Sequence, residues 1–190
     1  MKLAIYTLTL PTFGWMKKDG VFFVSIDRET KFVYAEIFAN KTMENATLFL
    51  KNVYKFYPYK IHTILTDNGL QFSYRALKKE LKPNKAHPFD EICNANNTEH
   101  RLTKFASLWT NGQIEKMNHI IKSAMLNIFY YESIDEYSKH LAKFLNYYNY
   151  KKKLKSLKFN SPYDKILTKY QEKPDLFLGN PSYYCMGLKT

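Results

Sequence analysis

The most informative stretch of this chain is Ile61–Phe72, IHTILTDNGLQF. Its first part, Ile61–Leu65, is apolar and β-rich, which predicts a buried strand. The strand runs directly into Asp67, Asn68 and Gly69, which are residues typical of turns. Because α/β sheets hold their sites at the carboxyl ends of strands, the Asp67 carboxylate lies where a functional group is expected. A simple turn explains the same residues, so both readings of Asp67 stay open.

The segments before this stretch predict three strands and a helix. The β-rich runs with tight connections are Leu3–Leu10, Val21–Ile26 and Lys31–Phe38, a pattern that favours an antiparallel meander. Thr42–Phe56 has apolar residues at helical spacing and begins with residues that cap helices. A strand that follows a helix, as Ile61–Leu65 does, is expected to join the sheet in parallel.

The segments after it predict one more strand and several helices. The expected helices are Tyr74–Leu81, Gln113–Tyr131, Ile134–Tyr148 with Ser133 as its N-cap, and Tyr163–Tyr170. His100–Phe105 is an expected short strand, while Lys82–Asn97 and Ala106–Gly112 are expected to be irregular. This order predicts an RNase H-like α/β fold, in which three antiparallel strands are extended by parallel strands and helices cover both faces.

Length and charge indicate one core and a polyanionic partner. The chain has 190 residues, a net charge of +12 and a pI near 9.5, which favours nucleic acid as the partner. Its aromatic content of 17% argues against disorder. We expect a core domain over residues 1–150 and a basic C-terminal extension with a short helix over residues 151–190.

Cysteine use and hydropathy predict a cytoplasmic protein without a zinc site. Cys93 and Cys185 are the two cysteines, far apart and in no metal-binding spacing. No apolar run reaches the ~18 residues that span a bilayer, and the N-terminus does not resemble a signal peptide. His87, Cys93 and His100 match no compact pattern of zinc ligands.

A second motif, Thr110–Glu115 (TNGQIE), leads into the expected long helix. Glu115, His119 and Lys122 stand at positions i, i+4 and i+7, so they share one polar helix face. An acid for a metal, followed by an imidazole and an ammonium for phosphate, fits a nuclease-like site. A solvated helix face has the same pattern, and an acid in a first helical turn is favoured by the helix dipole.

The stretches ILTDNGLQF and WTNGQIEKMNHIIK together resemble the catalytic core of DDE insertion-sequence transposases and retroviral integrases. The tail LNYYNYKKKLKSLKFNSPYDKIL and the segment IDRETKFVYAEIF resemble further parts of the same core. The resemblance covers about Ile5 to Leu167. It implies DNA strand transfer in transposition by a two-metal mechanism, with Mg²⁺ or Mn²⁺ held by three carboxylates.

By position, the resemblance assigns Asp67 as the second acid and Glu115 as the third, both as metal ligands. It also assigns His119 and Lys122 as DNA contacts, DNA ends and target as partners, and a possible homo-oligomer. The first acid is missing, because the matching stretch Ile5–Pro11 has Tyr6 in its place. A phenol with a pKa near ~10 is a poor Mg²⁺ ligand at neutral pH.

Further departures from the family concern Asp27, spacing and length. Asp27 either substitutes for the missing acid or serves only in a turn. Asp67 and Glu115 lie further apart than is usual in the family, and the helix-turn-helix module that relatives carry before this core is lacking. We therefore expect an N-terminally truncated and impaired transposase core. The alternative is a non-catalytic remnant that binds DNA or an intact transposase.

A lysine-rich run follows the expected last helix of the core. Tyrosines precede it at positions 147, 148 and 150, and the lysines are Lys151, Lys152, Lys153, Lys155 and Lys158. Such a run predicts a phosphate-contacting surface with aromatic rings able to stack on bases. A solvated charged face is the alternative.

Overall fold

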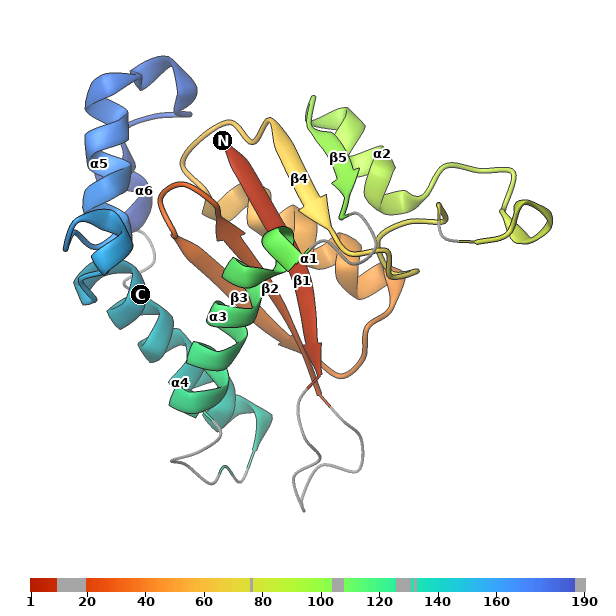
Figure 1. Cartoon of the computed structure of the whole chain (residues 1–190), viewed down its shortest axis with the longest axis horizontal. Helices are drawn as coiled ribbons and strands as arrows, with labels where there is room; N and C mark the ends of the chain where they lie inside the picture. Colours follow the sequence, from red (N-terminus) through yellow and green to blue (C-terminus); the bar gives the residue numbers. More distant parts are fainter. Residues whose placement is uncertain (10–19, 76, 104–107, 126–130, 132, 187–190) are drawn as a thin grey trace.

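The computed structural model describes residues 1–9, 20–75, 77–103, 108–125, 131 and 133–186. At its centre is a five-stranded mixed sheet in the order β3-β2-β1-β4-β5 (Figure 1). The strands are β1 (Lys2–Thr9), β2 (Val21–Asp27), β3 (Val33–Phe38), β4 (Thr63–Thr66) and β5 (Glu99–Leu102).

Strand pairing follows the predicted topology. β1, β2 and β3 form an antiparallel meander, and β4 joins β1 in parallel. β5 then pairs with β4, again in parallel. The expectation of an RNase H-like mixed sheet with helices on both faces is confirmed.

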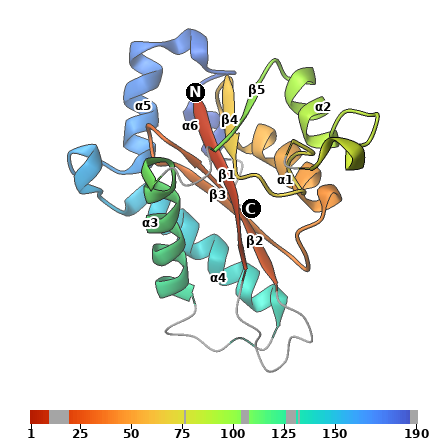
Figure 2. The same ribbon diagram turned by 45° about the vertical axis from the view of Figure 1, so that its right-hand side comes forward.

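Helices cover both faces of the sheet (Figures 1 and 2). Leu3 and Ile5 of β1 belong to the core cluster that contains the buried residues of α1 (Met43–Phe56) and α2 (Pro88–Ala95). Ala4 and Tyr6 point to the other face, where they join residues of α3 (Leu108–Met125) and α4 (Ile134–Asn146). This alternation follows from the two-residue period of a strand.

The helix α1 forms as predicted. The Thr42 hydroxyl accepts a hydrogen bond from the Asn45 N–H at 3.3 Å and so caps the helix. The apolar residues at helical spacing become its buried side, which comprises Ala46, Phe49, Leu50 and Val53. α4 likewise begins after Ser133, whose hydroxyl accepts from the Glu136 N–H at 3.1 Å.

The expected helix at Tyr74–Leu81 is wrong, because the described part of that segment forms only a 3-10 turn at Lys79–Leu81. The helix lies further on, as α2, within the stretch expected to be irregular. Three local signals explain it: His87 accepts from the Phe89 N–H, Pro88 opens the first turn, and acids follow there. Phe89 and Cys93 form its buried side.

The helix α3 begins earlier than predicted. It starts at Leu108, so the expected loop over residues 106–112 is helical from residue 108 on, Gly112 included. Its described part runs to Met125, and Tyr131, the expected last residue, is not helical. Residues 126–130 lie outside the described part. Met117 and Ile121 form the expected buried stripe.

The C-terminal segment packs against the core. After α4 come a π-helical turn (Tyr147–Lys151), a 3-10 turn (Lys155–Leu157), α5 (Pro162–Glu172), a second 3-10 turn (Pro174–Leu176) and α6 (Pro181–Met186). Ile166 and Phe177 join the core cluster beneath α1, and Tyr59 forms an isolated bridge with Phe177. The domain division at residue 150 remains a prediction. Among the described helices, none has the length and apolar character to cross a membrane.

Candidate functional site

Tyr6 and Asp67 come level with each other on β1 and just after β4. The parallel ladder pairs Leu3 with Ile64 and Ala4 with Leu65. Two residues further along both chains, the same register leads to Tyr6 and Asp67. The position that the resemblance assigns to the first acid thus neighbours the carboxyl end of β4.

Tyr6 is a core residue. Its side chain is 3% exposed and belongs to the cluster formed with α3 and α4. Burial raises the pKa of its phenol well above the usual value, and Tyr148 nearby raises it further. The hydroxyl has no hydrogen-bond partner among the described residues. Tyr6 is therefore a neutral, buried phenol at neutral pH.

Asp67 is half-buried and belongs to a turn. Its Oδ1 atom accepts a hydrogen bond from the Gly69 N–H at 2.8 Å. Asn68 donates from its side-chain amide to the Thr103 carbonyl at 3.1 Å, which ties this turn to the chain after β5. Burial raises the pKa of Asp67, against the opposing effects of the Gly69 N–H and of Lys41. The turn engages only one of the two carboxylate oxygens, so Asp67 still fits either a turn residue or a functional carboxylate.

Glu115, His119 and Lys122 all lie on α3, which packs across the face that holds Tyr6. The backbone of Glu115 is helical, while its side chain lies outside what the structure describes. His119 and Lys122 are exposed, and Ser123 contacts the His119 ring at 3.5 Å. The buried stripe of α3 therefore faces the sheet and leaves these two side chains to solvent.

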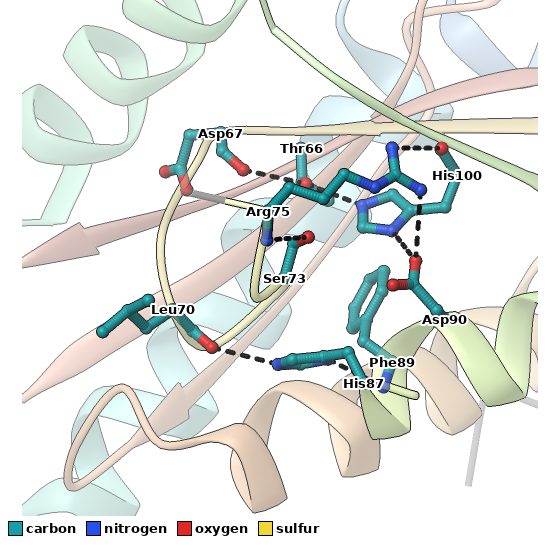
Figure 3. A network of polar contacts seen from close by, with 9 residues as sticks. All are labelled: Thr66, Asp67, Leu70, Ser73, Arg75, His87, Phe89, Asp90 and His100. Atoms are coloured by element: carbon teal, nitrogen blue, oxygen red, sulfur yellow. Dashed lines mark hydrogen bonds and ion pairs between the residues drawn. The ribbon is translucent and has the colours of Figure 1, made fainter. Parts of the chain in front are cut away.

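A polar network that the sequence did not predict holds the strand end in front of Asp67 (Figure 3). The Thr66 hydroxyl donates to the Asp67 carbonyl at 3.0 Å and lies 2.8 Å from Nε2 of His100. Nδ1 of His100 lies 2.5 Å from Oδ1 of Asp90 on α2. Arg75 approaches the same carboxylate at 3.8 Å and donates to the His100 carbonyl at 3.4 Å. The Asp67 carboxylate points away from this network.

Burial lowers the pKa of His100, although Asp90 acts in the opposite direction. His100 is thus a structural link between β4, β5 and α2. The acid at position 90, in the capped first turn of a helix, was a signal in the sequence that could have located α2. Nothing in the sequence indicated that Asp90 contacts His100 on β5.

The secondary candidates have structural partners. Asp27 is fully buried in the β2–β3 turn, where it accepts from Glu29 N–H at 3.0 Å, Thr30 at 2.7 Å and Tyr59 at 2.9 Å. It pairs with Leu3, three residues before Tyr6 on β1, and it accepts from Tyr59 of the core cluster on the other face of the sheet, so it does not replace the missing acid.

The other candidates were residues considered as zinc ligands. Nε2 of His87 lies 3.0 Å from the Leu70 carbonyl, and its Nδ1 accepts from the Phe89 N–H at 3.1 Å. Burial raises the pKa of the Cys93 thiol to about 12. These side chains are integrated into the packing around α2.

The lysines of the basic run differ in their surroundings. Lys151, Lys155 and Lys158 are exposed and have no acidic partner within ion-pair distance among the described residues. Lys153 pairs with Asp164 at 2.7 Å, and the Lys152 ammonium lies 5.7 Å from the centre of the Tyr148 ring. Of the three preceding tyrosines, Tyr147 is exposed (54%), whereas residues 148 and 150 are buried or half-buried.

The residues described around Asp67 do not fit a site for two Mg²⁺ ions. No cluster of three or more His, Cys, Asp or Glu side chains suited to a metal occurs in the described part of the chain, which excludes the Glu115 side chain. A neutral phenol in the core supplies no charge at the position of the first acid. The carboxylate set that the resemblance implies is therefore incomplete at Tyr6.

Comparison with solved structures supports the fold. The chain is similar to the catalytic core domain of BIV integrase, with a TM-score of 0.65 and 15% sequence identity over 90% of this chain and 97% of that one. No protein-family model matches the sequence, and a search of curated proteins finds no match. At this identity the similarity defines the fold, which is that of a retroviral integrase core.

Proposed function

We propose that this chain is a transposase- or integrase-type core that binds DNA and has lost the metal-dependent strand-transfer chemistry of such cores. The fold it shares with an integrase core supports the first part, together with its net charge of +12. The second part rests on Tyr6. Its side chain is neutral and buried, and it occupies the position on β1 that lies level with Asp67.

Loss of the first carboxylate is expected to abolish catalysis rather than weaken it slightly. Two bound cations need several negative ligands to offset their own charge and to hold their geometry. Asp67 and Glu115 remain as the proposed ligands from the carboxyl end of β4 and from α3. Neither carboxylate replaces the negative charge that is missing at residue 6.

Nicking of supercoiled plasmid with Mn²⁺ tests the catalytic half of the proposal. Wild type and Asp67→Asn should both leave the plasmid intact. Metal-dependent nicking by wild type that disappears in Asp67→Asn would overturn the proposed loss of activity. Tyr6→Asp is the informative gain-of-function variant, provided that circular dichroism shows it to be folded.

Measurements of DNA binding test the proposed interaction with DNA. For this purpose the lysines of the basic run fall into those with and those without an ion-pair partner in the described part of the chain. We expect the exposed group Lys151, Lys155 and Lys158 to contact phosphates, since none of them has an ion-pair partner among the described residues. Replacing all three with Gln should reduce the slope of log K against log salt by about 2 to 3, at ~0.9 per phosphate contact. The same slope in the triple variant would remove this surface from the proposal.

A matched control comes from Lys153, which pairs with Asp164 at 2.7 Å. Its ammonium already has a counter-charge, so Lys153→Gln should change the salt slope less than Lys151→Gln does. His119→Gln and Lys122→Gln test the exposed face of α3 in the same assay. A wild-type chain that binds no DNA at low salt would contradict the proposed function as a whole.

A further inference from the structure

A tight turn in the basic run has an unusual composition. The residues Leu154–Asn160 form a small closed loop, in which the Leu154 N–H donates to the Asn160 carbonyl at 3.1 Å and the Phe159 N–H donates back to the Leu154 carbonyl at 3.0 Å. At its tip, the Asn160 N–H donates to the Leu157 carbonyl at 3.1 Å, which closes a four-residue turn.

Both central residues of this turn have left-handed backbone angles. Lys158 has φ 54° and ψ 44°, and Phe159 has φ 62°. Two successive positive φ values define a type I′ turn, for which Asn-Gly is the preferred pair. A bulky aromatic residue with positive φ is an outlier, because its Cβ meets the backbone. A lysine and a phenylalanine therefore occupy positions that disfavour them.

Packing does not explain the phenylalanine. Phe159 is 66% exposed, belongs to neither core cluster and makes no ring contact with a described residue. The turn beneath it is nevertheless well anchored. Leu157 is buried, the Asn160 side-chain amide donates to the Leu157 carbonyl at 3.1 Å, and Lys153 binds Asp164 on α5. Strained residues that their surroundings hold in place cluster at functional sites, which makes the exposed Phe159 ring a candidate for binding.

The charges around the ring indicate what it binds. Lys158 is its neighbour in the turn, and Lys151 and Lys155 are exposed in the same segment. In Figures 1 and 2 this segment lies on the side of α5, away from α2 and β5. A flat aromatic surface next to cations matches a nucleotide, whose base stacks on the ring while its phosphates contact the lysines.

We propose that Phe159 is a stacking platform for an unpaired DNA base, with Lys155 and Lys158 contacting the flanking phosphates. The inference rests on the proposed function and adds a substrate preference, namely single-stranded DNA or a duplex with an unpaired end. A fully paired duplex hides the faces of its bases within the stack, so it engages the lysines but not the ring.

The test uses the full chain and three labelled DNAs of equal length in fluorescence anisotropy: a single strand, a blunt duplex and a duplex with a short single-stranded tail. Phe159→Gly should weaken binding to the single strand and the tailed duplex by about 5-fold or more, as expected for a lost base–aromatic stack. Binding to the blunt duplex should change by less than about 2-fold. Phe159→Trp should keep or improve the preference.

Two controls accompany these variants. Glycine relieves the backbone strain at this position, so Phe159→Gly should unfold at the same or a higher temperature than wild type, which separates lost binding from lost folding. Tyr183→Ala removes another exposed ring (75% exposed), on α6, and should leave all three affinities unchanged.

Three results would overturn the inference. If wild type binds DNA but Phe159→Gly binds all three DNAs equally well, the stacking role is wrong and the proposed function stands. If wild type binds none of them, both proposals fail. Sedimentation with vesicles that contain phosphatidylserine is measured alongside. If Phe159→Gly reduces only this sedimentation and leaves DNA binding unchanged, the ring inserts into a membrane surface and does not stack on a base.

Discussion

The hydroxyl of Tyr6 offers a sharp test of the account of this site. We expect Tyr6→Phe to stabilise the protein, because the change removes a hydroxyl that is buried without a partner among the described residues and keeps the ring in place. A buried polar group left unsatisfied costs about 1–3 kcal/mol. Part of this is offset by the contacts that the oxygen atom makes, so a gain of about 1 kcal/mol is expected.

Thermal and urea unfolding measure this gain. For a chain of this size, 1 kcal/mol corresponds to a change in Tm of about 2–4 °C. The midpoint in urea should rise while the slope m stays the same, since the surface exposed on unfolding is unchanged.

Tyr57→Phe is the matched control. Its hydroxyl is also fully buried, but it lies 3.1 Å from the Ser25 hydroxyl and donates towards the carbonyls of Ser25 (3.2 Å) and Phe32 (3.1 Å). Removing it should therefore destabilise the protein by about 1–2 kcal/mol. If Tyr6→Phe destabilises the protein by a similar amount, the Tyr6 hydroxyl has a partner and the expected gain in stability is wrong.

Three further predictions concern the framework of the fold. Burial lowers the folded-state pKa of His100, so the stability of the fold is full above about pH 6.5, where this side chain is neutral, and is lost as the pH falls. Tm should therefore drop between about pH 7 and 5. The drop should be smaller in His100→Gln, whereas His119→Gln, at an exposed position, serves as the control. Asn149→Ala should lower the free energy of unfolding in urea by about 2–3 kcal/mol. The reason is that the buried Asn149 amide accepts from the Val33 N–H at 2.9 Å and donates to the Val33 carbonyl at 2.7 Å. A loss of stability no greater than that of Asn146→Ala, at an exposed position, would contradict this. Phe177→Ala should cost about 3 kcal/mol if the C-terminal segment is part of the core, whereas the adjacent Leu178→Ala, at an exposed position (53%), should change the stability by less than about 0.5 kcal/mol.

Local patterns in the sequence predicted most of the fold. The meander, the helix α1 with its four buried residues and the parallel strand β4 follow from short-range periodicity and capping. The helix expected at Tyr74–Leu81 and the start expected for α3, which lies later than the observed start at Leu108, were wrong for different reasons. For α2 the local signals are present in the cap at His87 and in Pro88, but the stretch was expected to be irregular. For α3 the glycine at position 112 indicated a loop, although it lies within the helix.

The site was predicted less completely than the fold. The register of β1 and β4 brings residue 6 level with Asp67. The roles of Asp67, Glu115, His119 and Lys122 remain predictions. The unequal surroundings of the lysines were not foreseeable, since the pairing of Lys153 with Asp164 depends on how α5 folds back.

Most of the strands and helices follow from the sequence alone, which also shows that an aromatic residue stands at position 6, where the resemblance implies an acid. These properties depend on neighbours a few positions apart in the chain. The tertiary structure alone shows that Tyr6 is buried in the core, that Asp27 is bonded within the β2–β3 turn level with Leu3, and that Phe159 is exposed on a strained turn. Burial arises from contacts between distant segments, which leave no periodic pattern in the sequence. The positive φ angles at Lys158 and Phe159 belong to a local turn, but these two residue types do not predict such a turn.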